Sequence, residues 1–347
     1  MKKYAIAGGL IVAIGLGGYL LRDNLKATFT VLDDSEDLSW VIDEGYRLDN
    51  ASNPRIMAYE DGVIELAYEY HATELLDHPG ANAYITSSDD GLEFDKGQQQ
   101  VGDQYRGDGI LLPDGTQRRY MEDMQNGYVI SQSSTDGGET WEDDEGYRYD
   151  LNEIDNGWMG VRTFWVNEDG SVGFIYNTNT ILQPDGTKSV AVRLAVSEPA
   201  DNGMNFELVN ENLINDTNED GFIEMSADPV VVIPEEGGVR LVVMRQGLDD
   251  VRPPVGRTGE ILSYFSEDGV EFEFEGSIVD WSDFEEFEVY SLNDPKIMQL
   301  DDGRFRVYVA AQIPDPEAEE SGEVRLEDGS MFHAGYKWIL VSVTTSQ

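Results

Sequence analysis

A run of oxygen-bearing side chains at 216–224 has the spacing of an ion-binding loop. It reads D-T-N-E-D-G-F-I-E, with Asp216, Asn218 and Asp220 at alternate positions, Gly221 at the turn and Glu224 at the end. Oxygen ligands at alternate positions around a glycine turn suit Ca²⁺. The run is not a full EF-hand loop, because it lacks the glutamate that such a loop carries at its twelfth position. The segment is therefore either a Ca²⁺ site formed by these four polar residues or a solvated acidic loop.

The supply of cysteine and histidine excludes several other chemistries. The chain has no cysteine, and its three histidines are His71, His78 and His333. Disulfide bonds, thiol catalysis, Cys-ligated zinc and a lipoprotein anchor are therefore excluded. A histidine-rich metal site is not expected either.

Acidic residues are scattered along the whole chain. Asp and Glu number 69 against 23 Lys and Arg, which gives a formal net charge of -46. A solvated acidic shell suits a protein that works in high salt, where self-repulsion is screened, and the alternative is an ordinary extracellular acidic protein that binds Ca²⁺. No nucleic-acid partner is expected, because the sequence offers no basic patch to neutralise phosphates. The hydrophobic content of 40% is enough for a sizeable core despite the charge.

The N-terminal segment, residues 1–27, is predicted to be a membrane anchor or a signal peptide. An apolar run at 5–21 follows two lysines and is ended by Arg22 and Lys26. Its length lies between that of a signal peptide core and that of a minimal membrane span. We expect a retained signal anchor with its N-terminus inside the cell, and a cleaved signal peptide is the alternative. The remaining domain, 28–347, would then lie outside the cell.

A glycine-rich turn recurs along this domain. The clearest copy is S-T-D-G-G-E-T-W at 134–141, with relatives at 87–94 and 265–272 and a looser one at 197–206. Each copy lies between two β-rich runs. Glycine accepts positive φ and the aspartate can bond the N–H groups of the turn, so each copy predicts a β-hairpin.

A second recurring phrase places Asn-Pro or Asp-Pro before two strands. Clear copies occupy 53–68, 228–243 and 294–309, and weaker ones lie at 108–115 and 161–170. Together the two phrases define five units of about four short strands each, with a period of roughly 50–65 residues, which is typical of a β-propeller. We therefore predict an all-β fold of five four-stranded blades, with six blades kept as an alternative.

The ends of the chain predict how the ring closes. Trp40–Asp49 reads W-V-I-D-E-G-Y-R-L-D and repeats Trp141–Asp150, which reads W-E-D-D-E-G-Y-R-Y-D. The second copy is expected to be the fourth strand of its unit, and the last unit lacks such a strand. The N-terminal copy is therefore predicted to supply the outer strand of the last blade, which hides the edges of the ring.

The turn at 134–141 resembles the Asp-box of the sialidase superfamily, also called the BNR repeat. The pattern S-x-D-x-G-x-T-W is complete there, and the related repeats cover nearly all of the chain after the anchor. The resemblance implies that these turns are structural and lie on the outer rim of a propeller. It does not by itself imply an enzyme, since the family's fold also serves non-catalytic proteins.

The same resemblance implies a set of site residues. Three arginines would clamp a sugar carboxylate, a tyrosine beside a carboxylate would attack the anomeric carbon, and an aspartic acid would protonate the leaving oxygen. The positions that match the family's phrases are Arg55, Arg245 and Arg257 for the clamp, Tyr290 with Asp228 for the nucleophile pair, and Asp77 for the acid. His71 stands where the family carries a further arginine.

A five-bladed ring also resembles the arabinanase and fructosidase clan, which places carboxylates at the start of the inner strands. The equivalent positions here are Asn53, Asp108, Asp228 and Asp294. Two functions therefore stay open. The first is a sialidase-like propeller outside the cell that acts on or binds glycans, with exo-glycosidase activity. The alternative is a non-catalytic propeller that binds glycans or proteins on the cell surface of a halophile. In either case we expect a monomer with a carbohydrate or surface glycoconjugate as partner.

Overall fold

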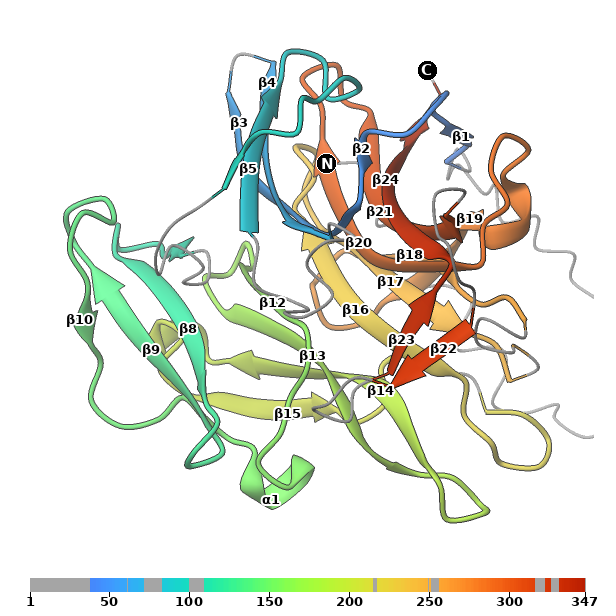
Figure 1. Cartoon of the computed structure of the whole chain (residues 1–347). Helices are drawn as coiled ribbons and strands as arrows, with labels where there is room; N and C mark the ends of the chain where they lie inside the picture. Colours follow the sequence, from blue (N-terminus) through green and yellow to red (C-terminus); the bar gives the residue numbers. More distant parts are fainter. Residues whose placement is uncertain are drawn as a thin grey trace, which may run out of the picture. The chain divides into compact units, whose positions relative to one another are not determined.

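The structure is a computed structural model that describes residues 38–346, apart from 61, 72–82, 100–108, 215–216, 249, 251–255, 316–321 and 326–330. These residues belong to one compact unit, Leu38–Gln347. They form five antiparallel sheets of four or five strands that follow one another along the chain around a common centre (Figure 1). Helix is confined, within the described ranges, to α1 (Asn152–Asp155) and two short 3₁₀ turns. The predicted five-bladed β-propeller is confirmed, and the six-bladed alternative is not.

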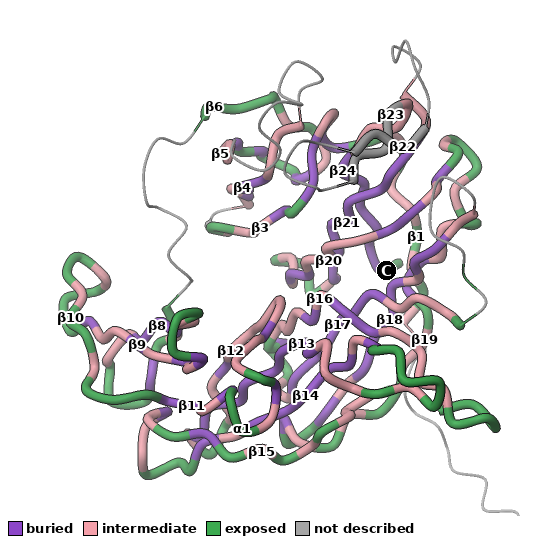
Figure 2. The backbone as a smooth tube through the Cα atoms, turned by 60° about the horizontal axis from the view of Figure 1, so that its bottom comes forward, coloured by how far each residue is buried: buried purple, intermediate pink, exposed green. Residues whose placement is uncertain are grey.

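In blades 1 to 4 the strands follow the chain from the centre outwards, whereas in blade 5 the N-terminal β1 is the outer strand. Blade 1 consists of β3 (Ala51–Glu60), β4 (Val63–Tyr70), β5 (Ala83–Ser88) and β6 (Gln98–Gln99). Blade 2 consists of β7 (Ile110–Leu111), β8 (Gln117–Asp123), β9 (Tyr128–Ser134) and β10 (Glu142–Asp143), with β11 (Tyr149–Asp150) also on β9. Figure 2 shows β3, β12, β16 and β20 towards the middle and the exposed β6 and β10 far from it.

The remaining blades follow the same plan. Blade 3 consists of β12 (Arg162–Val166), β13 (Val172–Leu182), β14 (Lys188–Ser197) and β15 (Phe206–Asn210). Blade 4 consists of β16 (Met225–Val232), β17 (Val239–Gln246), β18 (Glu260–Ser266) and β19 (Glu273–Asp280). Blade 5 consists of β20 (Ser291–Gln299), β21 (Phe305–Pro314), β24 (Tyr336–Thr345) and β1 (Trp40–Ile42), with β2 (Leu48–Asp49) also on β24. A separate hairpin, β22 (Gly322–Arg325) and β23 (Met331–Ala334), lies between β21 and β24 in the chain.

The N-terminal segment closes the ring as the repeat predicts. Strand β1 pairs antiparallel with β24, with Trp40 opposite Thr345, and β2 pairs with the same strand, with Leu48 opposite Leu340. The related segment of blade 2 makes the same two contacts with its own third strand, because β10 and β11 both pair with β9. The two copies of the repeat therefore form the same structure. Trp141–Asp150 follows the strand with which it pairs, whereas Trp40–Asp49 is at the opposite end of the chain from its partner β24.

The hydrophobic core lies between neighbouring sheets. Between blades 5 and 1, Leu66 and Tyr68 pack with Tyr308 and Leu340, and all four are at most 4% exposed. Burial of large side chains of this kind contributes roughly 1.5–3 kcal/mol each. The middle strands β17 and β21 are buried along nearly their whole length, because they pack against neighbouring blades on both faces.

The inner strands of three blades share one irregularity. Asn53, Asp228 and Asp294 have φ of 47°, 53° and 53°, and each precedes a proline. The register with the second strand shifts at each of these positions. Proline cannot donate to a sheet, and asparagine and aspartate tolerate the left-handed region, so the Asn-Pro or Asp-Pro phrase forms a bulge at the channel end of the strand.

The N-terminal segment of residues 1–27 and the domain boundary that follows it lie outside the described residues. In the part of the chain that the structure describes, no helix combines the length and the apolar character needed to cross a membrane. The membrane anchor stays a prediction.

Candidate functional site in the central channel

A cavity of about 460 Å³ opens where the inner strands of blades 1, 4 and 5 begin. Its walls come from β3, β4, β16, β17, β20, β21 and β24, and β20 contacts β3, β16 and β17. The polar lining includes Ser52, Glu69, His71 and Asp294, and Trp338 adds an aromatic surface. Ser52 and Asp294 come from the inner strands β3 and β20, next to the register shifts of those strands.

Asp228, Asp294 and Lys296 lie close enough for their charges to act on one another, and Asp294 is the member of this group that lines the cavity. Burial and the charge of Asp228 raise the pKa of Asp294 to about 7. Burial also raises the pKa of Asp228, against the charge of Lys296. The pKa of Lys296 is lowered by burial, although both aspartates act in the opposite direction. Two neighbouring buried carboxyl groups cannot both ionise easily, so Asp228 and Asp294 together retain a proton near neutral pH.

Backbone amides link the three bulges around the channel. The N–H of Asn53 donates to Oδ2 of Asp294 at 3.3 Å. The backbone amide of Asp294 in turn hydrogen-bonds the carboxylate of Asp228 and acts to lower its pKa. Each carboxylate thus faces the bulge of the next blade. A single amide does not offset the burial of either carboxylate, so both keep raised pKa values.

A serine and a histidine lie on the blade 1 side of the cavity. Ser52 Oγ is 2.6 Å from His71 Nε2, and Ser52 is only 5% exposed. Burial lowers the pKa of His71, whereas the charge of Glu69 acts to raise it. Ser52 is the second residue of β3 and lies opposite Glu69 in the register of β3 and β4, and His71 directly follows β4. The pairing of the two strands therefore brings these three residues together.

The three predicted arginines occupy different surroundings. Arg55 lies in β3, and its charge adds to burial, the main cause, in lowering the pKa of both Lys296 and Arg162. Arg245 contacts the carboxylates of Glu224, at 3.2 Å, and Glu260. Because Met244 and Gln246 line the cavity, the intervening Arg245 belongs to the other face of β17.

The third predicted arginine contacts the predicted nucleophile. Arg257 lies over the ring of Tyr290, with 3.3 Å between its guanidinium carbon and the ring centroid. The Tyr290 hydroxyl donates to Glu288 at 3.0 Å, and Arg257 bonds the same carboxylate oxygen at 2.8 Å. Burial, first, and the bond to Glu288 raise the pKa of Tyr290. The carboxylate beside Tyr290 is therefore Glu288, whereas Asp228 is grouped with Asp294 and Lys296.

The predicted Ca²⁺ loop is described only from its second residue onwards. Asn218 Oδ1 accepts from the N–H groups of Asp220, at 3.0 Å, and Phe222, at 2.9 Å. The side chain of Glu224 bonds Arg245. In the described part of the chain no three His, Cys, Asp or Glu side chains are grouped as a metal site would require. Asp77, Asp108 and Asp216 lie outside the described residues.

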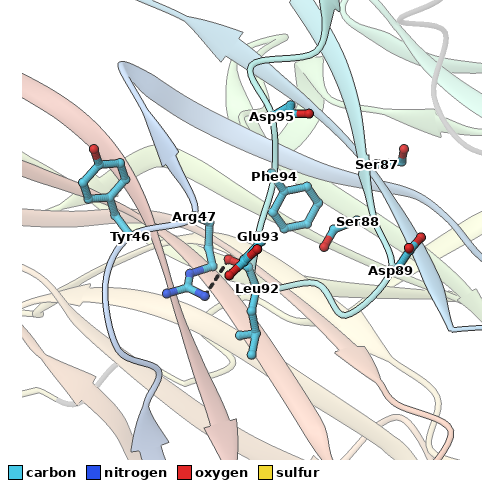
Figure 3. A pocket seen from close by; sticks show the side chains of 9 residues that line it. All are labelled: Tyr46, Arg47, Ser87, Ser88, Asp89, Leu92, Glu93, Phe94 and Asp95. Atoms are coloured by element: carbon cyan, nitrogen blue, oxygen red, sulfur yellow. Dashed lines mark hydrogen bonds between the residues drawn. The ribbon is translucent and has the colours of Figure 1, made fainter.

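A larger cavity, of about 620 Å³, lies at the outer rim and holds none of the predicted catalytic residues. Figure 3 shows Arg47 of the closing segment pointing towards the turn that carries Leu92 and Glu93. Arg47 donates to the carbonyls of Leu92 at 2.7 Å and Gly45 at 2.9 Å. Its guanidinium thus fastens the N-terminal segment Trp40–Asp49 to blade 1, and the candidate site is the smaller channel cavity.

Comparisons with known proteins add the fold and little more. No protein-family model and no curated protein matches this chain. A solved structure described as a glycoside hydrolase is 12% identical, with a TM-score of 0.54, and the match covers 88% of this chain and 92% of that one. A structure of a BT0996 RGII complex is also 12% identical, with a TM-score of 0.51 and coverage of 88% and 90%. At this identity the likeness shows a shared β-propeller fold.

Proposed function

We propose that the channel cavity binds a glycan and hydrolyses a glycosidic bond, with Asp294 as the proton donor and Asp228 as its ionised partner. The observation that carries the proposal is the pair of buried carboxylates at equivalent bulges of neighbouring blades, of which Asp294 has a pKa raised to about 7 by burial and by the charge of Asp228. Glycoside hydrolysis uses two carboxyl groups, one protonated to release the leaving oxygen and one ionised to assist at the anomeric carbon.

The environment separates these two roles. An acid of pKa about 7 keeps a proton at neutral pH and can still transfer it, which is the condition for effective general acid catalysis. The Lys296 charge favours the ionised form of both carboxylates, but Asp294, which lines the cavity, is in addition acted on by the charge of Asp228, which raises its pKa after burial. Trp338 offers the kind of flat apolar face on which a sugar ring can stack. Two structures with the same fold are described as a glycoside hydrolase and an RGII complex, which supports carbohydrate as the ligand.

A sialidase-type site is the second candidate, and one contact favours it. Tyr290 is bonded to a carboxylate and covered by Arg257, as a tyrosine nucleophile with an arginine nearby would be. In this version Arg257, Arg245 and Arg55 would receive the carboxylate of an acidic sugar. Arg245 and Arg257 already bond glutamates, so an acidic sugar would have to displace those contacts. This cost places the candidate second.

The proposal also covers the location of the protein, its oligomeric state and its dependence on salt and Ca²⁺. We propose that residues 1–27 anchor the propeller at the cell surface, that it acts as a monomer and that its acidic surface is adapted to high salt. A Ca²⁺ ion held by Asp216, Asn218, Asp220 and Glu224 would strengthen the loop before β16. The net charge of -46 supports the salt dependence. Thermal unfolding measured with increasing KCl, and with Ca²⁺ or a chelator, tests these points directly.

The test of activity uses a panel of fluorogenic glycosides in high-salt buffer. The panel contains arabinofuranosides, xylosides, fructosides and a sialoside. Release of fluorophore from a neutral glycoside, lost in Asp294→Asn and Asp228→Asn, supports the channel site. Release from the sialoside alone, lost in Tyr290→Phe, would favour the second candidate. If no glycoside is cleaved but oligosaccharides still bind by calorimetry, the protein is a binding module and both catalytic candidates fail.

A further inference from the structure

We propose that Ser52 and His71 form a nucleophile and base pair that hydrolyses small acyl esters, such as the O-acetyl groups of a carbohydrate, in the channel cavity. The pair stands on geometry that the glycosidase proposal does not use. Ser52 Oγ and His71 Nε2 are 2.6 Å apart, and both residues line the cavity. A serine hydroxyl within hydrogen-bond reach of an imidazole, with a third group that acts on the imidazole, is the arrangement of an activated nucleophile.

The surroundings set the state of the imidazole. Burial lowers the pKa of His71, so the ring is neutral at neutral pH and Nε2 can accept the proton of Ser52. Glu69, which lies opposite Ser52 across the β3–β4 pair, also lines the cavity, and its charge stabilises the imidazolium that forms when that proton moves. These are the roles of the second and third members of a serine hydrolase triad.

The next residue in the chain supplies a donor for the developing oxyanion. Asn53 follows Ser52, has a φ of 47° and directs its N–H to Oδ2 of Asp294. The N–H group of the residue after the nucleophile is a recurrent oxyanion donor. With its proton retained, the carboxyl of Asp294 is a second donor beside that N–H, as protonated carboxylic acids are in other enzymes. Ser52, the N–H of Asn53 and the Asp294 carboxyl thus lie on one wall of the cavity, and an ester oxygen would take the place of Asp294 Oδ2 on the Asn53 N–H.

The reaction balances without any co-reactant other than water. Ser52 Oγ forms a bond to the ester carbonyl carbon while His71 Nε2 takes the serine proton. The carbon–oxygen bond to the sugar breaks, and His71 returns the proton to the departing oxygen, which leaves as a hydroxyl. A water molecule then attacks the acyl-serine, again through His71. The products are the free sugar hydroxyl, a carboxylic acid and the original enzyme.

The experiment uses p-nitrophenyl acetate and a fluorophosphonate with the full-length protein. We expect hydrolysis of the ester, modification of Ser52 located by peptide mass spectrometry, and a fall in kcat/KM of at least ~100-fold in Ser52→Ala and in His71→Ala. Ser226→Ala is the matched control. Ser226 is 2% exposed and is the second residue of the inner strand β16, as Ser52 is of β3, and it does not belong to the described lining of the cavity. It should keep the activity, and circular dichroism checks that each variant is folded.

Each outcome decides the matter. Ester hydrolysis that persists in folded Ser52→Ala, or labelling of another residue, overturns the proposal, and so does the absence of both hydrolysis and labelling. The glycoside panel gives an independent result. Ester hydrolysis without glycoside hydrolysis keeps this inference and removes the glycosidase proposal, whereas glycoside hydrolysis without fluorophosphonate labelling does the reverse.

Discussion

Aspartates at the channel and at the rim of this propeller have opposite electrostatics. At the rim, Asp268 accepts hydrogen bonds from the N–H groups of Val270 and Glu271, and backbone bonds are the main cause of its lowered pKa. Asp136 accepts from Thr140 through both side chain and backbone, and these bonds lower its pKa to about 2. In the channel, burial and a second carboxylate raise the pKa of Asp294 to about 7.

The difference lies in what the backbone offers each carboxylate. A rim turn folds around its aspartate and points several N–H groups at it, in contact with water. A channel bulge gives its carboxylate one amide from the next blade, inside a narrow cavity. The carboxylate of the recurrent turn therefore stays ionised, because several hydrogen-bond donors stabilise its charge. The channel carboxylates have fewer donors and raised pKa values. Carboxyl groups with such pKa values can transfer protons near neutral pH.

The largest expected effect is on activity. Asp294→Asn removes the protonated carboxyl and should lower kcat for a cleaved glycoside by about 10²–10⁴-fold, the usual contribution of a general acid. Asp136→Asn changes a rim aspartate by the same chemistry and should leave kcat unchanged, because that side chain bonds only within its own turn. Steady-state kinetics on both purified variants makes the comparison. Equal losses in the two would mean that the channel aspartate has no special role.

A large effect on stability is expected where a rim turn packs against the neighbouring blade. Gly91 has a φ of +69°, and a Cβ there would lie 2.3 Å from Ile64 and 2.5 Å from both Arg306 and Tyr308. Arg306 and Tyr308 cannot move away cheaply, because they donate to the carbonyls of Asp90 and Gly91. Gly91→Ala should therefore lower the free energy of unfolding by about 2–4 kcal/mol.

Gly137 provides the matched control for this substitution. It has a similar φ of +78° in the turn of blade 2, but a Cβ there would meet nothing within 4 Å. Gly137→Ala should cost only about 1 kcal/mol of backbone strain. Urea unfolding of both variants separates strain from packing. If both variants lost the same free energy of unfolding, the contacts of Gly91 between blades 5 and 1 would not contribute to stability.

The sequence predicts the rim better than the channel, for a physical reason. Rim turns and the closing segment Trp40–Asp49 depend on local hydrogen bonds and on repetition, so their pattern is visible in the order of residues. The channel depends on which strand starts meet. Asp228 and Asp294 could be named because each precedes proline at the start of a repeat, but their shared proton depends on how close two blades lie.

For other residues of the site, the sequence contains only weak indications of a role in the channel. Lys296 stands two residues after Asp294, where the first repeat carries Arg55, and that recurrence of a basic residue could have marked it as a channel group. Ser52 and His71 are separated by a whole hairpin, and only the register of β3 and β4 brings them together. Glu288 reaches Tyr290 from two residues away, a spacing too common to stand out.

The next effect concerns the pH dependence of stability. Asp294 has an ordinary pKa of 3.8 and a folded pKa of about 7. Between these values the unfolded chain is ionised at this position while the folded chain keeps its proton, so the free energy of unfolding falls as pH rises. The loss attributable to this group should reach about 1–3 kcal/mol by pH 8 and be absent in Asp294→Asn. Chemical unfolding at pH 4, 6 and 8 compares the two proteins, and parallel profiles would contradict the raised pKa.

The smallest expected effect comes from a rim aspartate and has the opposite sign. The pKa of Asp268 is lowered in the folded chain, so its ionised form stabilises the fold above the ordinary pKa of 3.8 and that contribution disappears as pH falls through the folded pKa. Because the carboxylate is exposed to water, Asp268→Asn should cost only about 0.5 kcal/mol at pH 7. The cost should shrink towards zero near pH 2, where both proteins carry a neutral side chain. Unfolding free energies at the two pH values test this, and a cost that grows on acidification would mean that the rim turn is not held by its charged carboxylate.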